Sequence, residues 1–110
     1  MKIAHLTDAT GYDPSSFVAE PLLDGSVSNV RLIRLSPGQT LPPHTHGVSD
    51  LMLYVVEGTS TLVTEHGPQQ FTTGSLVFLR GDEELRVTNE GEVGVTLLAF
   101  LAPPFPPRTS

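Results

Sequence analysis

Residues 42–58 read PPHTHGVSDLMLYVVEG, an extended segment followed by an apolar run that ends at a glycine. The two prolines hold the backbone extended and remove two hydrogen-bond donors, so this segment is expected at the rim of a sheet. The run at 51–57 is apolar on both of its faces, which predicts a strand buried on both sides. Side chains two residues apart in a strand share a face, so His44 and His46 are expected to enter one pocket.

Short apolar runs and turn residues continue on both sides of this stretch. Ten glycines and ten prolines in 110 residues favour many turns, and no stretch shows the period of about 3.6 residues that marks an amphipathic helix. Regularly spaced short strands indicate an all-β sandwich or barrel. We expect the strands at 30–35, 51–57, 59–64, 69–72, 75–80, 84–88 and 93–101.

The length of 110 residues fits a single domain. Turn signals predict an irregular lead-in over residues 1–26, followed by a core at about 27–101. The proline-rich tail, residues 102–110, is expected either as an arm on the surface or on a partner subunit, or as a disordered segment.

The charge balance disfavours two classes of partner. The chain has a net charge of −6 and only six lysines and arginines, so we expect it to bind neither nucleic acid nor an anionic membrane surface. Two of the arginines, Arg31 and Arg34, fall on opposite faces of the expected strand at 30–35. An edge or solvent-exposed strand explains them more simply than a polar cavity does.

Cysteine is absent, which excludes disulfides, thiolate nucleophiles and cysteine-type zinc sites. The N-terminus, MKIAHLTDATGYD, lacks the apolar region of a signal peptide, and no apolar run approaches the roughly 20 residues of a membrane span. No Walker A, GxGxxG or GxSxG pattern is present, which disfavours nucleotide binding and serine-hydrolase chemistry. The sequence therefore fits a cytoplasmic protein.

One motif resembles the first motif of the cupin superfamily. That motif reads Gly, five residues, His, one residue, His, three or four residues, Glu, six residues, Gly. Gly38, His44 and His46 match its first half, and Gly58 matches its end. Leu51 stands where the family has the glutamate.

The segment from Gly74 to Asn89 resembles the second cupin motif, which reads Gly, five residues, Pro, one residue, Gly, two residues, His, three residues, Asn. Both ends match. Between them, Arg80 replaces the proline and Asp82 replaces the glycine. Leu85 stands where the family has its third histidine. The short segment between the two motifs is typical of small single-domain bacterial cupins.

The resemblance implies a double-stranded β-helix, a jelly-roll barrel of two packed sheets with a pocket at one open end. It also implies a divalent metal held by three histidines and one glutamate, and a chain that is often a homodimer. Met52 and Tyr54 are expected to pack in the core or at an interface. Because the leucines at two of these ligand positions, Leu51 and Leu85, cannot ligate a metal, we consider two hypotheses for the function of the pocket, one with a metal and one without.

The first hypothesis is an atypical metal centre that binds a small molecule. His44, His46 and Asp50 would form a two-histidine, one-carboxylate set for Fe, Mn, Zn or Ni, provided that a bulge turns Asp50 inward. Glu83 and Glu84 are weaker substitutes on a nearby turn. As an enzyme, such a protein would be a metal-dependent oxygenase, isomerase or lyase acting on a small metabolite.

The second hypothesis is a ligand-binding or sensing module with no metal and no catalytic activity. In that case the two histidines are polar anchors in a pocket whose other residues are Leu51, Leu53, Arg80, Leu85 and Val87. Arg80 would bind a carboxylate at the rim. A structural dimer without any ligand is a third alternative.

Overall fold

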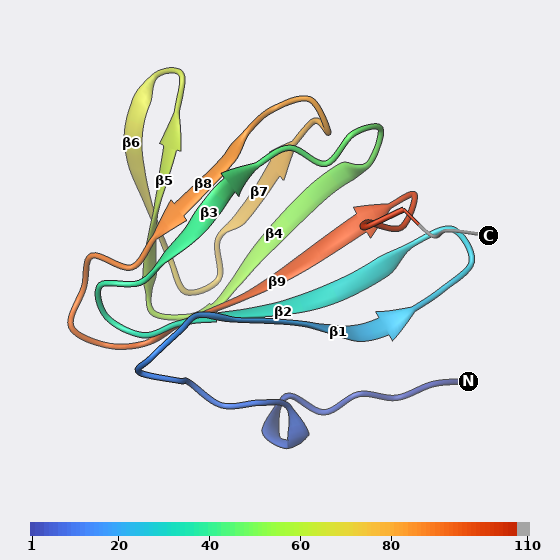
Figure 1. Cartoon of the computed structure of the whole chain (residues 1–110), viewed down its shortest axis with the longest axis horizontal. Coiled ribbons are helices and arrows are strands. Elements are labelled where there is room, and N and C mark those ends of the chain that lie inside the picture. The colour runs from blue at the N-terminus through green and yellow to red at the C-terminus, as the bar shows by residue number, and fades with distance from the viewer. Residues whose placement is uncertain (108–110) are drawn as a thin grey trace.

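A computed structural model, described here for residues 1–107, shows two antiparallel sheets packed face to face (Figure 1). The five-stranded sheet has the order β1-β2-β9-β4-β7, and the four-stranded sheet has the order β3-β8-β5-β6. The all-β prediction is confirmed. The strands are β1 (Val18–Asp24), β2 (Asn29–Leu35), β3 (Thr40–His44), β4 (Asp50–Glu57), β5 (Thr59–Thr64), β6 (Gly67–Thr72), β7 (Leu76–Leu79), β8 (Leu85–Thr88) and β9 (Val95–Ala102).

The hydrophobic core lies between the two sheets. In β4, Leu51, Leu53 and Val55 alternate inward and are almost completely buried. Met52 on the same strand is 53% exposed, so the prediction that β4 is buried on both faces was wrong. The physical reason is that no other layer of the described chain covers the outer face of the five-stranded sheet at Met52.

The predicted lead-in contains a strand that the sequence did not reveal. β1 pairs antiparallel with β2, with Val18 opposite Arg34 and Asp24 opposite Asn29. Pro21, together with a shift of register between Pro21 and Leu23, interrupts the alternation of apolar and polar residues by which a strand is recognised in a sequence. An edge strand such as β1 tolerates both features. A single turn of 3-10 helix, η1 (Leu6–Asp8), precedes β1. In the part of the chain that the structure describes, no helix has the length and apolar character of a membrane span.

β3 carries the two prolines of the opening stretch and is an edge strand, as the rim prediction requires. The tail, predicted from residue 102 onward, begins with the last residue of β9, and residues 103–107 follow it. Phe105 packs against the core cluster instead of projecting as an arm. Residues 108–110 of the predicted tail lie outside the described residues.

The loop after β3 is held by a close backbone contact. The His46 amide donates to the Gly81 carbonyl at 2.8 Å. A side chain at Gly81 would collide with the carbonyl oxygens of Gly47 and Ser49, which are backbone atoms that cannot rotate away. Glycine at 81 therefore fixes where the loop places His46.

We expect Gly81→Ala to lower the free energy of unfolding by about 1–3 kcal/mol, because overpacking against backbone forces the loop to shift. Urea unfolding followed by circular dichroism measures this change. Gly11→Ala is the control, because a side chain there meets nothing within 4 Å, and it should change stability by less than about 0.5 kcal/mol. Equal stability of Gly81→Ala and wild type would contradict the proposed role of the loop contact.

Candidate functional site

The structure brings His44 and His46 together at the open end of the barrel. His44 is the last residue of β3, and His46 follows in the loop fixed by Gly81. Their ring centroids are 4.5 Å apart, with an angle of 61° between the rings. Both line a cavity of about 280 Å³ between the two sheets, whose wall includes Leu85 of β8.

The structure fixes the hydrogen bonding of His44 and the burial of His46. Nδ1 of His44 lies 2.8 Å from the Pro42 carbonyl, so this nitrogen must carry the proton, and Nε2 of a neutral ring is the acceptor. His46 is only 4% exposed, and its Nδ1 is buried without a hydrogen-bond partner among the described residues. Burial, and to a smaller extent the neighbouring His44, lowers the pKa of His46 to about 4. His46 is therefore neutral at physiological pH.

Arg31 of β2 is the cationic group of the cavity. It lines the cavity together with Ile33, which lies on the same face of the strand. The solvent-exposed reading of this arginine was therefore wrong, whereas Arg34 does lie on the other face, over the ring of Tyr12 at 5.5 Å. No carboxylate within residues 1–107 forms an ion pair with Arg31.

The remaining walls of the cavity are apolar. They come from both sheets and from the segments that flank them, and include Phe17, Ile33, Leu41, Leu85, Leu101 and Phe105. Phe105 closes one side, with its ring centroid 4.9 Å from that of His46 and 6.4 Å from that of His44. The alternation of residues along β2 indicates that Arg31 shares a face with Ile33. No pattern in the sequence indicates that Phe105 of the tail reaches this cavity.

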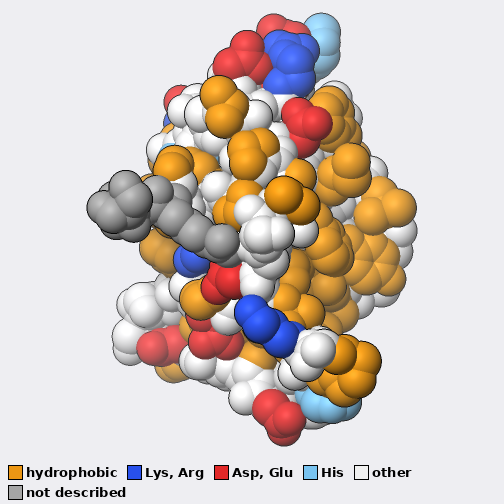
Figure 2. Space-filling model, turned by 90° about the vertical axis from the view of Figure 1, so that its right-hand side faces the viewer, with side chains coloured by type: hydrophobic (Ala, Val, Ile, Leu, Met, Phe, Trp, Pro, Cys, Tyr) orange, Lys and Arg blue, Asp and Glu red, His pale blue; other side chains and the backbone are white. Residues whose placement is uncertain are grey.

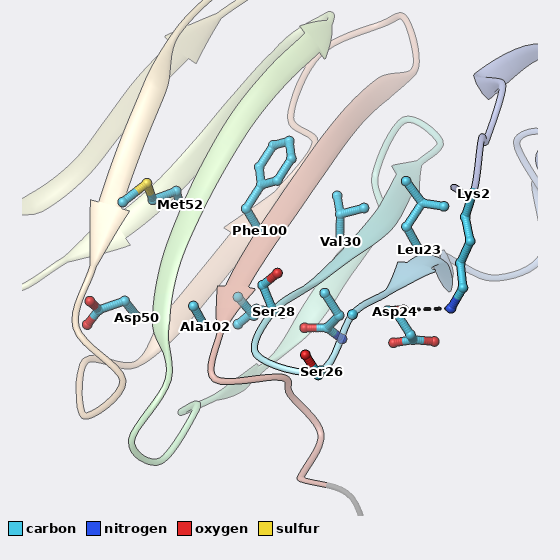
Figure 3. Close-up of a pocket in the computed structure, with 13 residues that line it drawn as sticks. Lys2, Leu23, Asp24, Ser26, Ser28, Val30, Asp50, Met52, Phe100 and Ala102 are labelled. Atoms are coloured by element: carbon cyan, nitrogen blue, oxygen red, sulfur yellow. Dashed lines mark hydrogen bonds between the residues drawn. The ribbon is translucent and has the colours of Figure 1, made fainter.

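Asp50 does not join the histidines. It pairs with Ala102 of β9 and Leu51 pairs with Leu101, so β4 starts in regular register without the bulge that would turn Asp50 inward. The register shift of this strand occurs later, between Val55 and Glu57. Asp50 consequently lies on the outer face of the sheet, beside Met52 (Figure 3), and the prediction that it completes a metal site is corrected.

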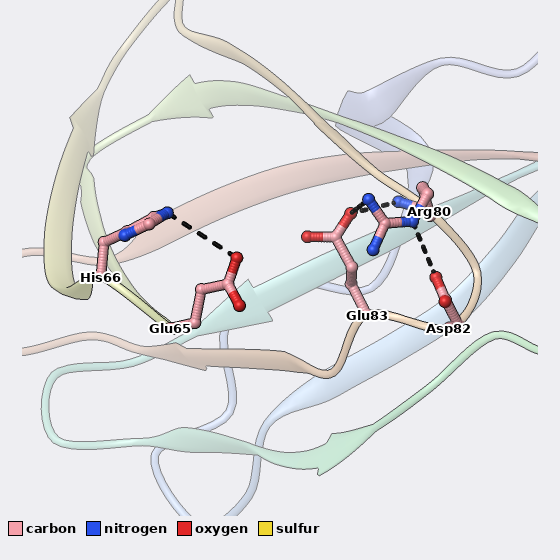
Figure 4. A network of polar contacts seen from close by, with 5 residues as sticks. All are labelled: Glu65, His66, Arg80, Asp82 and Glu83. Atoms are coloured by element: carbon pink, nitrogen blue, oxygen red, sulfur yellow. Dashed lines mark hydrogen bonds and ion pairs between the residues drawn. The ribbon is translucent and has the colours of Figure 1, made fainter.

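The other predicted pocket residues are dispersed. Arg80 lies in an exposed polar network away from the cavity, where it binds Asp82 at 3.0 Å and Glu83 at 3.7 Å (Figure 4). Leu51, Leu53 and Val87 are buried in the core and do not line the cavity. Leu85 is the only one of the five predicted pocket residues that the structure places there.

The donor set of the site does not fit the metal that the family usually carries. Two of the four family ligand positions hold Leu51 and Leu85, which have no lone pairs to donate. Within residues 1–107, no group of three or more histidine, aspartate or glutamate side chains is placed to hold a metal ion. Arg31 adds a positive charge where a divalent cation would need a negative one.

A separate feature lies on the outer face of the five-stranded sheet. Cross-strand pairing aligns Phe78, Met52, Phe100, Val30 and Leu23 in one row across β7, β4, β9, β2 and β1. A groove of about 640 Å³ runs along part of this row (Figure 3). In Figure 2, hydrophobic side chains gather along one side of the molecular surface. We call this row, together with Leu76 beside Phe78 on β7, the outer apolar face.

We predict that His46 makes stability depend on pH between about 4 and 6.5. Its folded pKa lies below the unfolded value, so the unfolded chain binds the extra proton first, and stability falls as pH drops through this window. The loss amounts to up to about 3 kcal/mol. Urea unfolding from pH 7.5 to 4 should show this loss in wild type but not in His46→Gln. His66→Gln, at an exposed hairpin tip, should keep the wild-type profile; a His46→Gln profile parallel to wild type would contradict the assignment.

Comparison with known proteins agrees with this architecture. The family model described as a cupin domain matches residues 31–101. The crystal structure of TT1209 from Thermus thermophilus has 26% identity and a TM-score of 0.85, and the match covers 94% of this chain and 99% of that one. No curated protein matches the sequence.

Two further structures share the fold. A Klebsiella pneumoniae protein with a double-stranded β-helix domain has 15% identity and a TM-score of 0.85, with 94% of this chain and 90% of that chain covered. An RmlC-like cupin protein from Desulfovibrio desulfuricans has 23% identity and a TM-score of 0.82, with 96% and 99% covered. The predicted double-stranded β-helix is confirmed.

Proposed function

The chain belongs to the cupin domain family, and from its cavity we propose that it binds a small organic acid without using a metal. The observation that carries the proposal is Arg31, a guanidinium group without a carboxylate partner among the described residues, in the wall of an otherwise largely apolar cavity. A half-buried cation of this kind is a favourable partner for an anion. A carboxylate matches the planar guanidinium because it accepts two parallel hydrogen bonds.

The rest of the cavity indicates what the acid carries besides its carboxylate. The volume of about 280 Å³ lies just below the usual range for small-molecule sites, which is roughly 300–1,000 Å³, so the ligand must be small. Phe17, Leu41 and Leu85 offer apolar contact to a compact hydrocarbon body or ring. Nε2 of His44 offers an acceptor for a hydroxyl or amine group.

The metal-dependent alternative, an oxygenase, isomerase or lyase centred on His44 and His46, receives less support from the same residues. Stable divalent sites need three or more protein ligands, and the described chain supplies two at this place. The ligand-binding reading needs only the acceptor that Nε2 of His44 offers and the cation of Arg31. We therefore assign the chain a binding or sensing role, with its specificity set by charge and by size.

Benzoate is a suitable first probe, because it joins one carboxylate to one compact apolar ring. We expect benzoate to bind to wild type in isothermal titration calorimetry, and benzyl alcohol, which lacks the charge, to bind far more weakly. Arg31→Gln should weaken benzoate binding about tenfold or more, since hydrogen bonds to a charged group contribute roughly 1.5–3 kcal/mol.

Arg86→Gln is the matched control, because Arg86 lies exposed on β8 and pairs with Glu84. It should bind benzoate as wild type does. The proposal is contradicted if wild type does not bind benzoate, or if Arg31→Gln binds it with unchanged affinity.

We further propose that the chain forms a homodimer through the outer apolar face. Phe78 and Met52 are each 53% exposed, Phe100 is 44% exposed and Leu76 is 73% exposed. Side chains of this size leave roughly 100 Å² each uncovered, or about 400 Å² in total. A standard interface buries about 800 Å² per partner, of which somewhat more than half is apolar, so this face matches what one partner of a stable dimer contributes.

A second copy of the chain suits this face better than a charged partner does. The row from Phe78 to Leu23 holds no charged side chain, and the charges beside it have both signs, Lys2 together with Asp24 and Asp50. A face of this composition can meet its own copy about a two-fold axis without opposing like charges.

Light scattering after gel filtration should give wild type a mass of twice 11.8 kDa. Phe100→Glu should give a monomer, because it places a charge in the centre of the apolar row. Val93→Glu is the control, because Val93 is a 66% exposed hydrophobic residue in the β8–β9 loop, away from the face, and it should remain dimeric. A monomeric wild type, or a dimeric Phe100→Glu, would contradict this interface.

A further inference from the structure

The chain after β9 turns back across the open end of the barrel. β9 ends at Ala102, and the next residues do not continue the sheet. Phe105 and Pro106 line the histidine cavity, whereas Pro104 and Pro106 line a shallow pocket on the outside of the same segment. We call residues 103–106 the strap, because they lie between the cavity and the surface.

Two side chains hold the strap by hydrogen bonds. The amide nitrogen of Asn29 donates to the Phe105 carbonyl at 2.7 Å, and the amide oxygen of Asn29 accepts from the Phe105 backbone N–H at 3.1 Å. Ser49 Oγ donates to the Pro103 carbonyl at 2.7 Å. Asn29 and Ser49 are 7% and 2% exposed, so the partners of the strap belong to the fixed body of the barrel.

The strap covers a buried polar atom of the site, Nδ1 of His46. The ring of Phe105 packs edge-on against His46 at 4.9 Å, and Nδ1 of His46 is buried without a hydrogen bond among the described residues. Arg31 borders both the cavity and the shallow pocket outside the strap, so the strap also lies against the proposed carboxylate-binding group. A ligand that reaches both groups from this side has to displace Phe105.

The attachment of the strap suits such a displacement. It is held by a few side-chain hydrogen bonds, each of modest net strength, and by one aromatic ring, whereas the strands beneath it are held by complete ladders. The strap can therefore detach while both sheets stay intact.

We propose that the strap opens and closes the cavity, with Phe105 controlling access to His46 and Asn29 acting as the positioning residue for Phe105. The role in ligand access rests on the proposed function of the cavity. The covering of His46 does not depend on it, so the two parts can be tested separately.

The first test uses no ligand. Diethylpyrocarbonate acylates neutral imidazole nitrogens that solvent can reach, and peptide mass spectrometry gives a labelling rate for each histidine. In wild type we expect His46 to react much more slowly than His66, whose side chain is 78% exposed and serves as the internal reference. Phe105→Ala should raise the His46 rate about tenfold or more, because the rate follows the fraction of molecules with the strap open.

Val93→Ala is the control, since it removes an exposed apolar side chain from the β8–β9 loop, outside both the cavity and the outer apolar face, and should leave the His46 rate unchanged. Asn29→Ala should raise the rate more than Ser49→Ala does, because Asn29 makes two bonds to Phe105 itself. Thermal unfolding of every variant tests whether its barrel remains folded. Should Asn29→Ala fail to fold, Phe105→Ala and Ser49→Ala still decide the question.

A reporter in the strap provides a second readout. The chain contains two tyrosines but no tryptophan, so Phe105→Trp introduces a single tryptophan, which can be excited selectively at wavelengths where tyrosine does not absorb. Its emission should be shielded from acrylamide, and adding Ser49→Ala should raise the quenching constant. Equal labelling of His46 and His66 in wild type, or an unchanged His46 rate in folded Phe105→Ala, would overturn the covering role.

The second test adds benzoate. Benzoate should slow His46 labelling in wild type, and in stopped-flow measurements Phe105→Ala should bind and release benzoate about tenfold or more faster. If benzoate does not bind while Phe105→Ala still exposes His46, the proposed function fails and the strap remains. If benzoate binds with equal rates to wild type and Phe105→Ala, the gating role fails and the proposed function remains.

Discussion

The register of β4 against β9 keeps a carboxylate out of the interior of the barrel. Leu51 opposite Leu101 and Asp50 opposite Ala102 are consecutive pairs, so the strand alternates from its first residue. Alternation sends Leu51 into the barrel and Asp50 out of it. A slip of one residue would reverse both, turning a carboxylate into the barrel and a leucine to the surface. The apolar interior of the barrel and the two-histidine site are consequences of the same constraint.

The same alternation produces the outer apolar face. With Leu51 and Leu53 directed inward, Met52 must point outward, and the flanking strands place Phe78 and Phe100 directly beside it. One strand thus supplies the core on one side and the proposed dimer surface on the other. Binding in the cavity and association of two chains therefore use opposite faces of the five-stranded sheet and need not compete.

A second constraint acts on His46. The Gly81 contact fixes the loop, and Phe105 covers the ring, so water cannot solvate a charged imidazole there. Its depressed pKa follows from this burial and keeps the ring neutral at physiological pH. Arg31 is then the dominant positive charge of the cavity. An acid can bind beside a neutral His46 without any change in the protonation of the histidine.

The sequence predicted those features of the fold and of the site that depend on the local periodicity of the residues. It anticipated seven of the nine strands of the described residues, because those runs alternate clearly or end at glycine. It also placed His44 and His46 together, although the loop contact with Gly81, and not the pleat of β3, positions His46. It did not reveal β1, in which Pro21 breaks the pattern. The direction of Asp50 remained open in the sequence, since it depends on which residue of β9 pairs with Asp50. The roles of Arg31 and Phe105 depend on contacts between distant segments, which no local pattern encodes.

The most direct measurement is a crystal structure of the protein grown with benzoate, with anomalous diffraction recorded at the iron and zinc edges. The account predicts benzoate in the histidine cavity, with its carboxylate on Arg31 and its ring against the apolar wall, and no anomalous peak at the two histidines. An anomalous peak between His44 and His46, or benzoate bound elsewhere with the cavity empty, would contradict it.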